Sequence, residues 1–250
     1  MKKNSSKYFS YLFAILLSCS PKSHIIRYDD NFLSIDSTLT PDSLITAEIV
    51  PYKVQFSKIM DEVLAYSEQA MFRDQPEGLL GNFTADATLK KTKEFCKDSC
   101  TVDFCVLNNG GLRNSLPKGN ITRGNVFQLM PFENEIVILK LDGNSLKEMF
   151  DFIANKGGMP IAGMKMKIKN NMASDVIISD KPFDISKSYW VVTSDYLASG
   201  GDNMSFFSNA QKKIMLEKKL RDVIIEYLQE ENKKGNTIKV KKDGRIEKVE

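Results

Sequence analysis

Histidine is nearly absent from this 250-residue chain, which contains only His24. Histidine is the commonest general base of enzymes and the commonest protein ligand of transition metals. One histidine near the N-terminus cannot supply a metal centre built on several imidazoles, nor a Ser/His or Cys/His nucleophile. We therefore expect no catalytic residues, no metal ligands and no resident cofactor in this chain.

Cysteine is also scarce, with four residues in the whole chain. Cys96, Cys100 and Cys105 have no histidine nearby and lack the paired, regular spacing of a zinc site. Cys105 lies in an apolar stretch typical of a buried strand, where a free thiol packs as a small hydrophobic group. A Cys96–Cys100 disulfide would suit an oxidising compartment, but the spacing alone leaves the question open. We assign these cysteines no chemistry.

An excess of charge is missing from the body of the chain. The formal net charge of +3 comes from Lys2, Lys3 and Lys7, and without them 32 basic and 32 acidic residues remain. Binding to nucleic acid depends on clustered cations, so we exclude nucleic acid as a partner. The hydrophobic fraction of 42% is ordinary for a globular protein.

The N-terminal segment lacks an apolar run long enough to span a membrane. The run Tyr8–Leu17 has about half the length of a membrane-spanning helix, which needs roughly 20 residues. Its length suits the apolar core of a signal peptide. The sequence Leu16-Leu17-Ser18-Cys19 resembles the lipobox of bacterial lipoproteins, in which the cysteine is acylated. We predict a lipoprotein signal peptide over 1–18, lipidation at Cys19, and a polar tether over 19–46. A plain secretory signal or an N-terminal membrane anchor is the alternative. Each places the remainder outside the cytoplasm, and the lipobox places it in the cell envelope, on the periplasmic side or at the outer membrane.

Residues 47–250 form the expected folded domain, in which helical and strand patterns alternate without a regular βαβ rhythm. The patterns predict an α+β domain with a mixed sheet. Helices are expected over Pro51–Ala70, Leu80–Lys91, a short stretch from Thr122, a stretch capped by Asn144 or Ser145 and ending at Asn155, and Leu216–Glu231. Strands are expected over Thr101–Leu107, Glu135–Leu141, Met164–Lys169, Val176–Ser179 and Tyr189–Thr193, with a closing hairpin over Thr237–Val249 that turns at Asp243-Gly244.

A polar, glycine-rich segment follows the predicted strand Thr101–Leu107. Gly110-Gly111 would let backbone N–H groups approach a ligand closely, and Arg113 is a planar cation suited to phosphate. Taken alone, the segment is more often a structural turn beside a solvated arginine.

A second polar segment follows the predicted strand Tyr189–Thr193. It places Tyr196 six residues before Asp202, across Gly200-Gly201. A ring can stack on a nucleobase and a carboxylate can accept from the hydroxyls of a ribose. A core tyrosine and a turn aspartate explain the same residues equally well.

Together these segments resemble the C-terminal domain of the 5′-nucleotidase family, which includes the periplasmic UDP-sugar hydrolases. The stretch from Asn108 to Pro131-Phe132, the segment Val137–Leu146 and the block Tyr196–Asp202 follow in the family's order. The resemblance covers about residues 50–250 and implies a layered α+β sandwich with mixed sheets.

The resemblance implies a nucleoside pocket. Phe132 and Tyr196 would stack on the two faces of the base, and Asp202 would bind the ribose. The full set of substrate-binding residues carried over by motif is Asn108, Gly110, Arg113, Phe132, Tyr196 and Asp202. Arg73 matches a second family arginine only with a shifted spacing.

Two of the aligned positions depart from the family pattern. Tyr196 stands where phenylalanine is usual, and because the ring is kept, Tyr196→Phe is expected to be nearly silent. Asn125 stands where aspartate is common and is expected to act at a helix start.

Proteins of that family also contain a metallophosphatase domain, in which histidines, aspartates and an asparagine hold two metals. His24 alone cannot rebuild such a centre. The resemblance therefore implies the substrate-binding domain of a split 5′-nucleotidase, inactive by itself, assisting a separate metallophosphatase chain that holds the divalent metals and hydrolyses nucleoside 5′-phosphates. A stand-alone envelope lipoprotein that binds nucleosides or nucleotides is the alternative, and a decayed domain kept for structure or adhesion is a third.

Overall fold

The computed structural model describes residues 32–97 and 100–249, so the predicted leader, Cys19 and His24 lie outside the described residues. Ile49–Glu250 forms one compact unit. In the residues that the structure describes, no helix combines the length and the apolar character needed to cross a membrane.

The first described helix is α2 (Ser43–Met60), and it begins and ends earlier than the sequence predicts. The Asp42 carboxylate accepts from the Leu44 and Ile45 N–H groups at 2.9 and 3.1 Å, which satisfies two donors of the first turn. Pro51 consequently lies inside the helix rather than in its first turn. The prediction of helix as far as Ala70 is wrong, because the chain instead forms the strand β1 (Val63–Ser67), paired antiparallel with β3 (Gly119–Thr122).

A five-stranded mixed sheet forms the centre of the domain, in the order β10-β4-β9-β2-β5. β2 runs parallel to β9, whereas β4–β9, β4–β10 and β2–β5 are antiparallel pairs, so the predicted mixed sheet is confirmed. Its strands are β2 (Phe104–Val106), β4 (Glu135–Asp142), β5 (Ile161–Ala162), β9 (Ser188–Ser194) and β10 (Lys212–Lys219).

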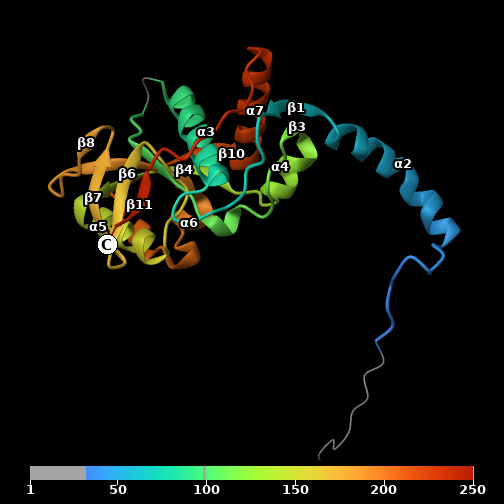
Figure 1. Cartoon of the computed structure of the whole chain (residues 1–250), viewed down its shortest axis with the longest axis horizontal. Helices are drawn as coiled ribbons and strands as arrows, with labels where there is room; N and C mark the ends of the chain where they lie inside the picture. Colours follow the sequence, from blue (N-terminus) through green and yellow to red (C-terminus); the bar gives the residue numbers. More distant parts are fainter. Residues whose placement is uncertain (1–31, 98–99, 250) are drawn as a thin grey trace, which may run out of the picture. The chain divides into compact units, whose positions relative to one another are not determined.

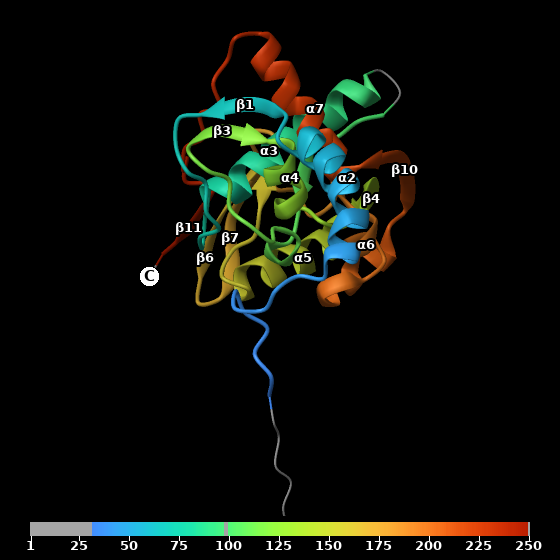
Figure 2. The same ribbon diagram turned by 90° about the vertical axis from the view of Figure 1, so that its right-hand side faces the viewer.

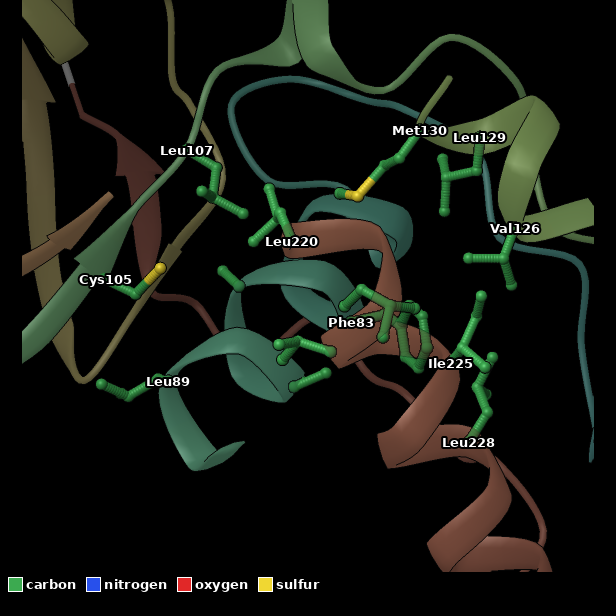
Figure 3. Close-up of a cluster of buried hydrophobic side chains, with 14 of the residues drawn as sticks. Phe83, Leu89, Cys105, Leu107, Val126, Leu129, Met130, Leu220, Ile225 and Leu228 are labelled. Atoms are coloured by element: carbon green, nitrogen blue, oxygen red, sulfur yellow. The ribbon is translucent and has the colours of Figure 1, made fainter. Parts of the chain in front are cut away.

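The central sheet is buried on both faces, which explains why its inner strands are continuous apolar runs. Along β4, Ile136 and Ile138 enter one hydrophobic cluster while Val137 and Leu139 enter the other. The helices α3 (Leu79–Cys96) and α7 (Leu220–Lys233) cover the first face. Figure 3 shows side chains of α3, α7 and α4 (Arg123–Leu129) packed together with Cys105 and Leu107 beside them.

The second face carries α5 (Gly143–Asn155) and a smaller four-stranded sheet, in the order β11-β6-β7-β8 (Figures 1 and 2). Helix α5 contributes Leu146, Met149 and Phe150 to the cluster shared with the two sheets. The small sheet consists of β6 (Met164–Lys169), β7 (Met172–Ile178), β8 (Lys181–Pro182) and β11 (Ile246–Lys248). The layered sandwich with mixed sheets is therefore confirmed.

The C-terminal segment does not form the predicted hairpin. β11 pairs parallel with β6, and Ile238 makes a separate bridge with Ser67. The turn at Asp243-Gly244 is held by the buried Glu77, whose two carboxylate oxygens accept from the N–H groups of Asp243 and Gly244 at 2.8 and 3.0 Å. Long-range contacts of this kind leave no local pattern in the sequence.

Two helix starts also differ from the prediction. The stretch Lys212–Lys219, partly assigned to a helix, pairs with β4 as strand β10, so α7 begins at Leu220. Asp142 caps α5 by accepting from the Ser145 N–H at 2.9 Å, in place of Asn144 or Ser145.

Helix α4 (Arg123–Leu129) begins as predicted. Thr122 and Asn125 form a reciprocal capping box, with the Thr122 N–H donating to Asn125 at 2.9 Å and the Asn125 N–H donating to Thr122 at 3.3 Å. The expected role of Asn125 at a helix start is confirmed.

Candidate functional site

Three loops meet at one edge of the central sheet. Because β2 and β9 are parallel neighbours, the chain leaves both strands at the same edge. β4 is antiparallel to β9, with Ile136 opposite Ser194, and therefore begins at that edge. The loops after β2, before β4 and after β9 carry most of the residues singled out by the sequence. In open parallel α/β sheets, ligands bind beyond the carboxyl ends of the strands, and β2 and β9 form one parallel pair of that kind here.

A hydrogen-bonded group that we call the Asp202 clamp consists of Asn108, Tyr196 and Asp202. The Asn108 side-chain amide donates to Asp202 Oδ2 at 2.6 Å, although the two residues are 94 positions apart. The Tyr196 hydroxyl donates to Asp202 Oδ1 at 2.8 Å. The hydrogen bond to Asp202 raises the pKa of the Tyr196 phenol.

Local backbone structure positions Tyr196. The Ser194 hydroxyl accepts from the Leu197 N–H at 3.3 Å and caps the short helix α6 (Asp195–Ala198) directly after β9. Asp195 Oδ1 accepts from the Glu135 N–H at 3.1 Å, which ties this helix to the start of β4. Tyr196 follows at once and points its half-exposed side chain away from the core.

Glycines leave the space that the Asp202 clamp occupies. A Cβ atom on Gly201 would lie 2.6 Å from the Tyr196 ring, and one on Gly111 would lie 2.8 Å from Asn108 Oδ1. A Cβ on Gly110 would meet Asn108 Nδ2 at 3.3 Å. These glycines therefore admit neighbouring side chains, a role that the sequence alone did not distinguish from close approach to a ligand.

Phe132 lies at the same edge, on the loop that precedes β4. The buried Arg221, at the start of α7, donates to the carbonyl oxygens of Met130 and Pro131 at 3.4 Å each. Arg221 also pairs with Glu133, whose pKa is lowered to about 2 by hydrogen bonds from Lys219 and Arg221. Fixed on both sides, the loop holds Phe132 with 47% of its surface exposed.

Two arginines border a neighbouring cavity of about 620 Å³. Arg73 Nη1 donates to the Asn109 carbonyl at 3.3 Å, and Arg113 Nη1 donates to the Gly110 carbonyl at 3.4 Å. Within residues 32–97 and 100–249, no carboxylate forms an ion pair with either guanidinium. Their charge is available to an anion in the cavity.

The structure joins some predicted residues directly and places others nearby. Asn108, Tyr196 and Asp202 are in contact, with Gly110 against them and Arg113 beside Gly110. Phe132 shares a small cavity of about 20 Å³ with Asn108. In the part of the chain that the structure describes, neither Phe132 nor Tyr196 packs against another aromatic ring. The supporting Arg221 was missed because it lies 91 positions along the chain from the loop carbonyl of Met130.

Metal-binding side chains were sought among residues 32–97 and 100–249. No cluster of three or more His, Cys, Asp and Glu side chains suited to a metal occurs in the described ranges. Cys96 and Cys100 form a disulfide, and Cys105 is buried in β2 as predicted, where burial raises the pKa of its thiol. The donor set present therefore does not fit a dinuclear centre.

Comparison with known proteins identifies the family of the chain. The model of the 5′-nucleotidase C-terminal domain matches residues 61–209. The trifunctional nucleotide phosphoesterase protein YfkN of Bacillus subtilis is 28% identical over 90% of this chain and 17% of that protein. An apyrase of Tabanus yao is 25% identical over 97% of this chain and 48% of that protein. This chain thus spans less than half of the length of either relative.

A solved structure shares the fold. The 5′-nucleotidase precursor of Thermus thermophilus superposes with a TM-score of 0.70 and 24% sequence identity, over 84% of this chain and 44% of that chain. Since the family model covers more than half of the 250 residues, the protein belongs to the 5′-nucleotidase C-terminal domain family.

Proposed function

We propose that this chain binds nucleosides and nucleoside 5′-phosphates as the substrate-binding half of a split 5′-nucleotidase. The observation that carries the proposal is the Asp202 clamp, an exposed carboxylate held by side chains from two loops at the sheet edge where three loops meet. A fixed carboxylate acceptor suits the hydroxyls of a ribose.

Two exposed aromatic rings on neighbouring loops support a place for the base. Phe132 and Tyr196 expose 47% and 46% of their surfaces, on loops that meet at the same edge. Large aromatic side chains are normally buried, and exposed rings beside a hollow are typical of stacking platforms. We assign the base to the space between these two rings.

The arginines support a place for the phosphate. Asp202 and Asn108 line a hollow of about 330 Å³, which shares Gln75 and Asn109 with the cavity that Arg73 and Arg113 border. A ligand with its ribose at Asp202 can therefore direct its 5′ group toward two guanidinium groups. Arginine recognises phosphate with paired, charge-assisted hydrogen bonds.

Hydrolysis would require a second polypeptide. The chain has one histidine, and the described residues contain no group of side chains suited to a metal. We propose that a separate metallophosphatase chain supplies the divalent metals, while this chain supplies recognition of the nucleoside. The measurement is hydrolysis of AMP by this chain, by a metallophosphatase chain encoded beside it, and by their mixture. Activity of the mixture well above the sum of its parts supports the split enzyme. Binding of AMP without any gain in hydrolysis would favour the stand-alone binding protein.

We also propose that the chain is anchored in the cell envelope through an acylated Cys19. The Cys96–Cys100 disulfide supports an oxidising compartment, because disulfides persist there and are rare in the cytoplasm. Cys19→Ala should move the protein from the membrane fraction to the soluble envelope fraction. Unchanged membrane fractionation with a cleaved leader would contradict the anchor.

A further inference from the structure

The Tyr196 hydroxyl makes two hydrogen bonds to one residue. It donates to the Asp202 carboxylate at 2.8 Å and accepts from the Asp202 backbone N–H at 3.3 Å. The phenol thus acts as a donor and an acceptor at once, toward the side chain and the backbone of the same residue. The hydroxyl therefore fixes the side chain of Asp202 relative to its own backbone.

The backbone at Asp202 and Asn203 has an uncommon conformation. Asp202 and Asn203 both adopt left-handed conformations, with φ of 54° and 66°. Residues other than glycine adopt this region uncommonly, although aspartate and asparagine tolerate it best. The bond from the Asp202 N–H to the phenol oxygen is well placed to hold this turn, which aims the carboxylate at the hollow that it lines.

The carboxylate keeps accepting capacity after its partners are counted. An ionised carboxylate offers about four acceptor positions on its two oxygens. Tyr196 uses one position on Oδ1, and Asn108 uses one position on Oδ2. One position on each oxygen remains for a ligand. Two adjacent acceptors on a fixed carboxylate match the two neighbouring hydroxyls of a cis-diol.

We infer that Tyr196, through its hydroxyl, is a positioning residue that presents Asp202 as a two-point acceptor for the ribose cis-diol and so makes the site select ribonucleosides over 2′-deoxyribonucleosides. This inference rests on the proposed function. It assigns the tyrosine a role separate from stacking, since a phenylalanine ring would stack equally well. It also replaces the expectation that removing the hydroxyl is nearly silent.

The decisive variant is Tyr196→Phe, compared with Tyr66→Phe as a matched control. Both tyrosines expose 46% of their surface, and Tyr66 lies on β1, outside the proposed site. Calorimetry with adenosine, 2′-deoxyadenosine and 2′,3′-dideoxyadenosine measures the three affinities for each protein. Tyr196→Phe removes both hydrogen bonds of the hydroxyl to Asp202 and should weaken adenosine binding about three- to ten-fold, the scale of the net contribution of an intramolecular hydrogen bond. Binding of the dideoxy analogue should not change, so the preference for ribose should collapse.

The outcomes separate this inference from the proposed function. Adenosine binding that is lost in Phe132→Ala but unchanged in Tyr196→Phe, with the ribose preference intact, would overturn the positioning role and leave the pocket standing. No adenosine binding by the unmodified chain would overturn both. Equal weakening of all three ligands by Tyr196→Phe would indicate a general loss of structure and would also overturn the inference.

A measurement without ligand tests the same hydrogen bond. The Tyr196 phenol should titrate above its ordinary pKa of 10 in the unmodified chain, because its proton is held by Asp202. NMR of ζ-carbon-labelled tyrosine should show this pKa falling toward the ordinary value in Asp202→Asn, while that of Tyr227, remote from the clamp, stays unchanged. An ordinary pKa in the unmodified chain would contradict the inference whatever the ligand does.

Discussion

Two carboxylate networks in this protein differ in how completely their hydrogen bonds are used. In the first, which we call the Arg245 network, the guanidinium of the buried Arg245 donates to Asp86, Asp243 and the Ile161 carbonyl at 2.7–3.0 Å. These bonds use all five N–H donors of an arginine. In the Asp202 clamp, two bonds occupy a carboxylate that can accept about four.

This difference separates a structural network from the network proposed to bind a ligand. A saturated network inside the protein has no capacity left for a ligand and holds distant segments together; here it fixes the C-terminal segment against α3. An exposed network with free acceptors contributes little to the free energy of unfolding, but its free acceptors can bind a ligand. Variants of the two networks should therefore change different measured quantities.

The largest effect is expected from Arg245→Met. The methionine keeps part of the side-chain volume but leaves Asp86 and Asp243 without their cation, which costs about 3 kcal/mol or more when a buried pair is broken. Urea unfolding should show this loss, whereas Lys248→Met, an exposed change on β11, should be neutral. Adenosine affinity of the folded variant should remain that of the unmodified chain. A loss of stability below about 1 kcal/mol, the scale of a surface pair, would remove the contrast between the networks.

A smaller effect, confined to phosphate-bearing ligands, is expected from Arg73→Ala and Arg113→Ala. Each should weaken AMP about five- to ten-fold, the scale of one charge-assisted hydrogen bond that is partly exposed to water. Adenosine has no phosphate and should bind each variant as it binds the unmodified chain. Lys118→Ala, which removes a cation outside the cavity, is the control for general charge effects. Equal loss of AMP and adenosine affinity would contradict the assigned phosphate position.

The smallest effect is an acid-dependent loss of stability at the contact between α3 and α7. The pKa of Glu231 is lowered from 4.5 to about 2, first by the hydrogen bond from Lys90 and then by that from Asn236. A lowered folded-state pKa means that the stabilisation is present above pH 4.5 and is lost as the pH falls toward 2. Glu231→Gln should make the free energy of unfolding less dependent on pH between pH 4.5 and 2. An unchanged slope would show that the pair contributes nothing in solution.

The sequence predicts most reliably where local pattern and tertiary burial agree. Both faces of the central sheet are buried, so β4 and β9 appear in the sequence as apolar runs, and their positions were correct to within one or two residues. Helix α5 follows at once because Asp142 caps it. Prediction from the local sequence pattern failed where contacts with residues distant in the sequence determine the structure. β1 depends on β3, and the C-terminal segment depends on Glu77 and β6.

The same distinction holds for the candidate site. Short motifs identified Asn108, Tyr196 and Asp202, which the fold then brings into contact through the parallel pairing of β2 and β9. The hydrogen bonds of the Tyr196 hydroxyl to Asp202 and the support of the Phe132 loop by Arg221 were not predicted from the sequence. Both depend on geometry between segments that are separate along the chain or on a turn whose conformation the sequence does not specify.

The central claim, a nucleoside site between two exposed rings at the sheet edge, is tested most directly by an NMR titration with AMP. The unmodified chain and the double variant Phe132→Ala/Tyr196→Ala are compared. Stacking on a ring is worth on the order of 1–3 kcal/mol per base, so each ring should contribute about ten-fold or more in affinity. A site between the two rings predicts saturable shifts that include residues 108–113 and 196–202 in the unmodified chain, and binding weakened about a hundred-fold in the double variant. AMP binding of equal strength in the two proteins would contradict it.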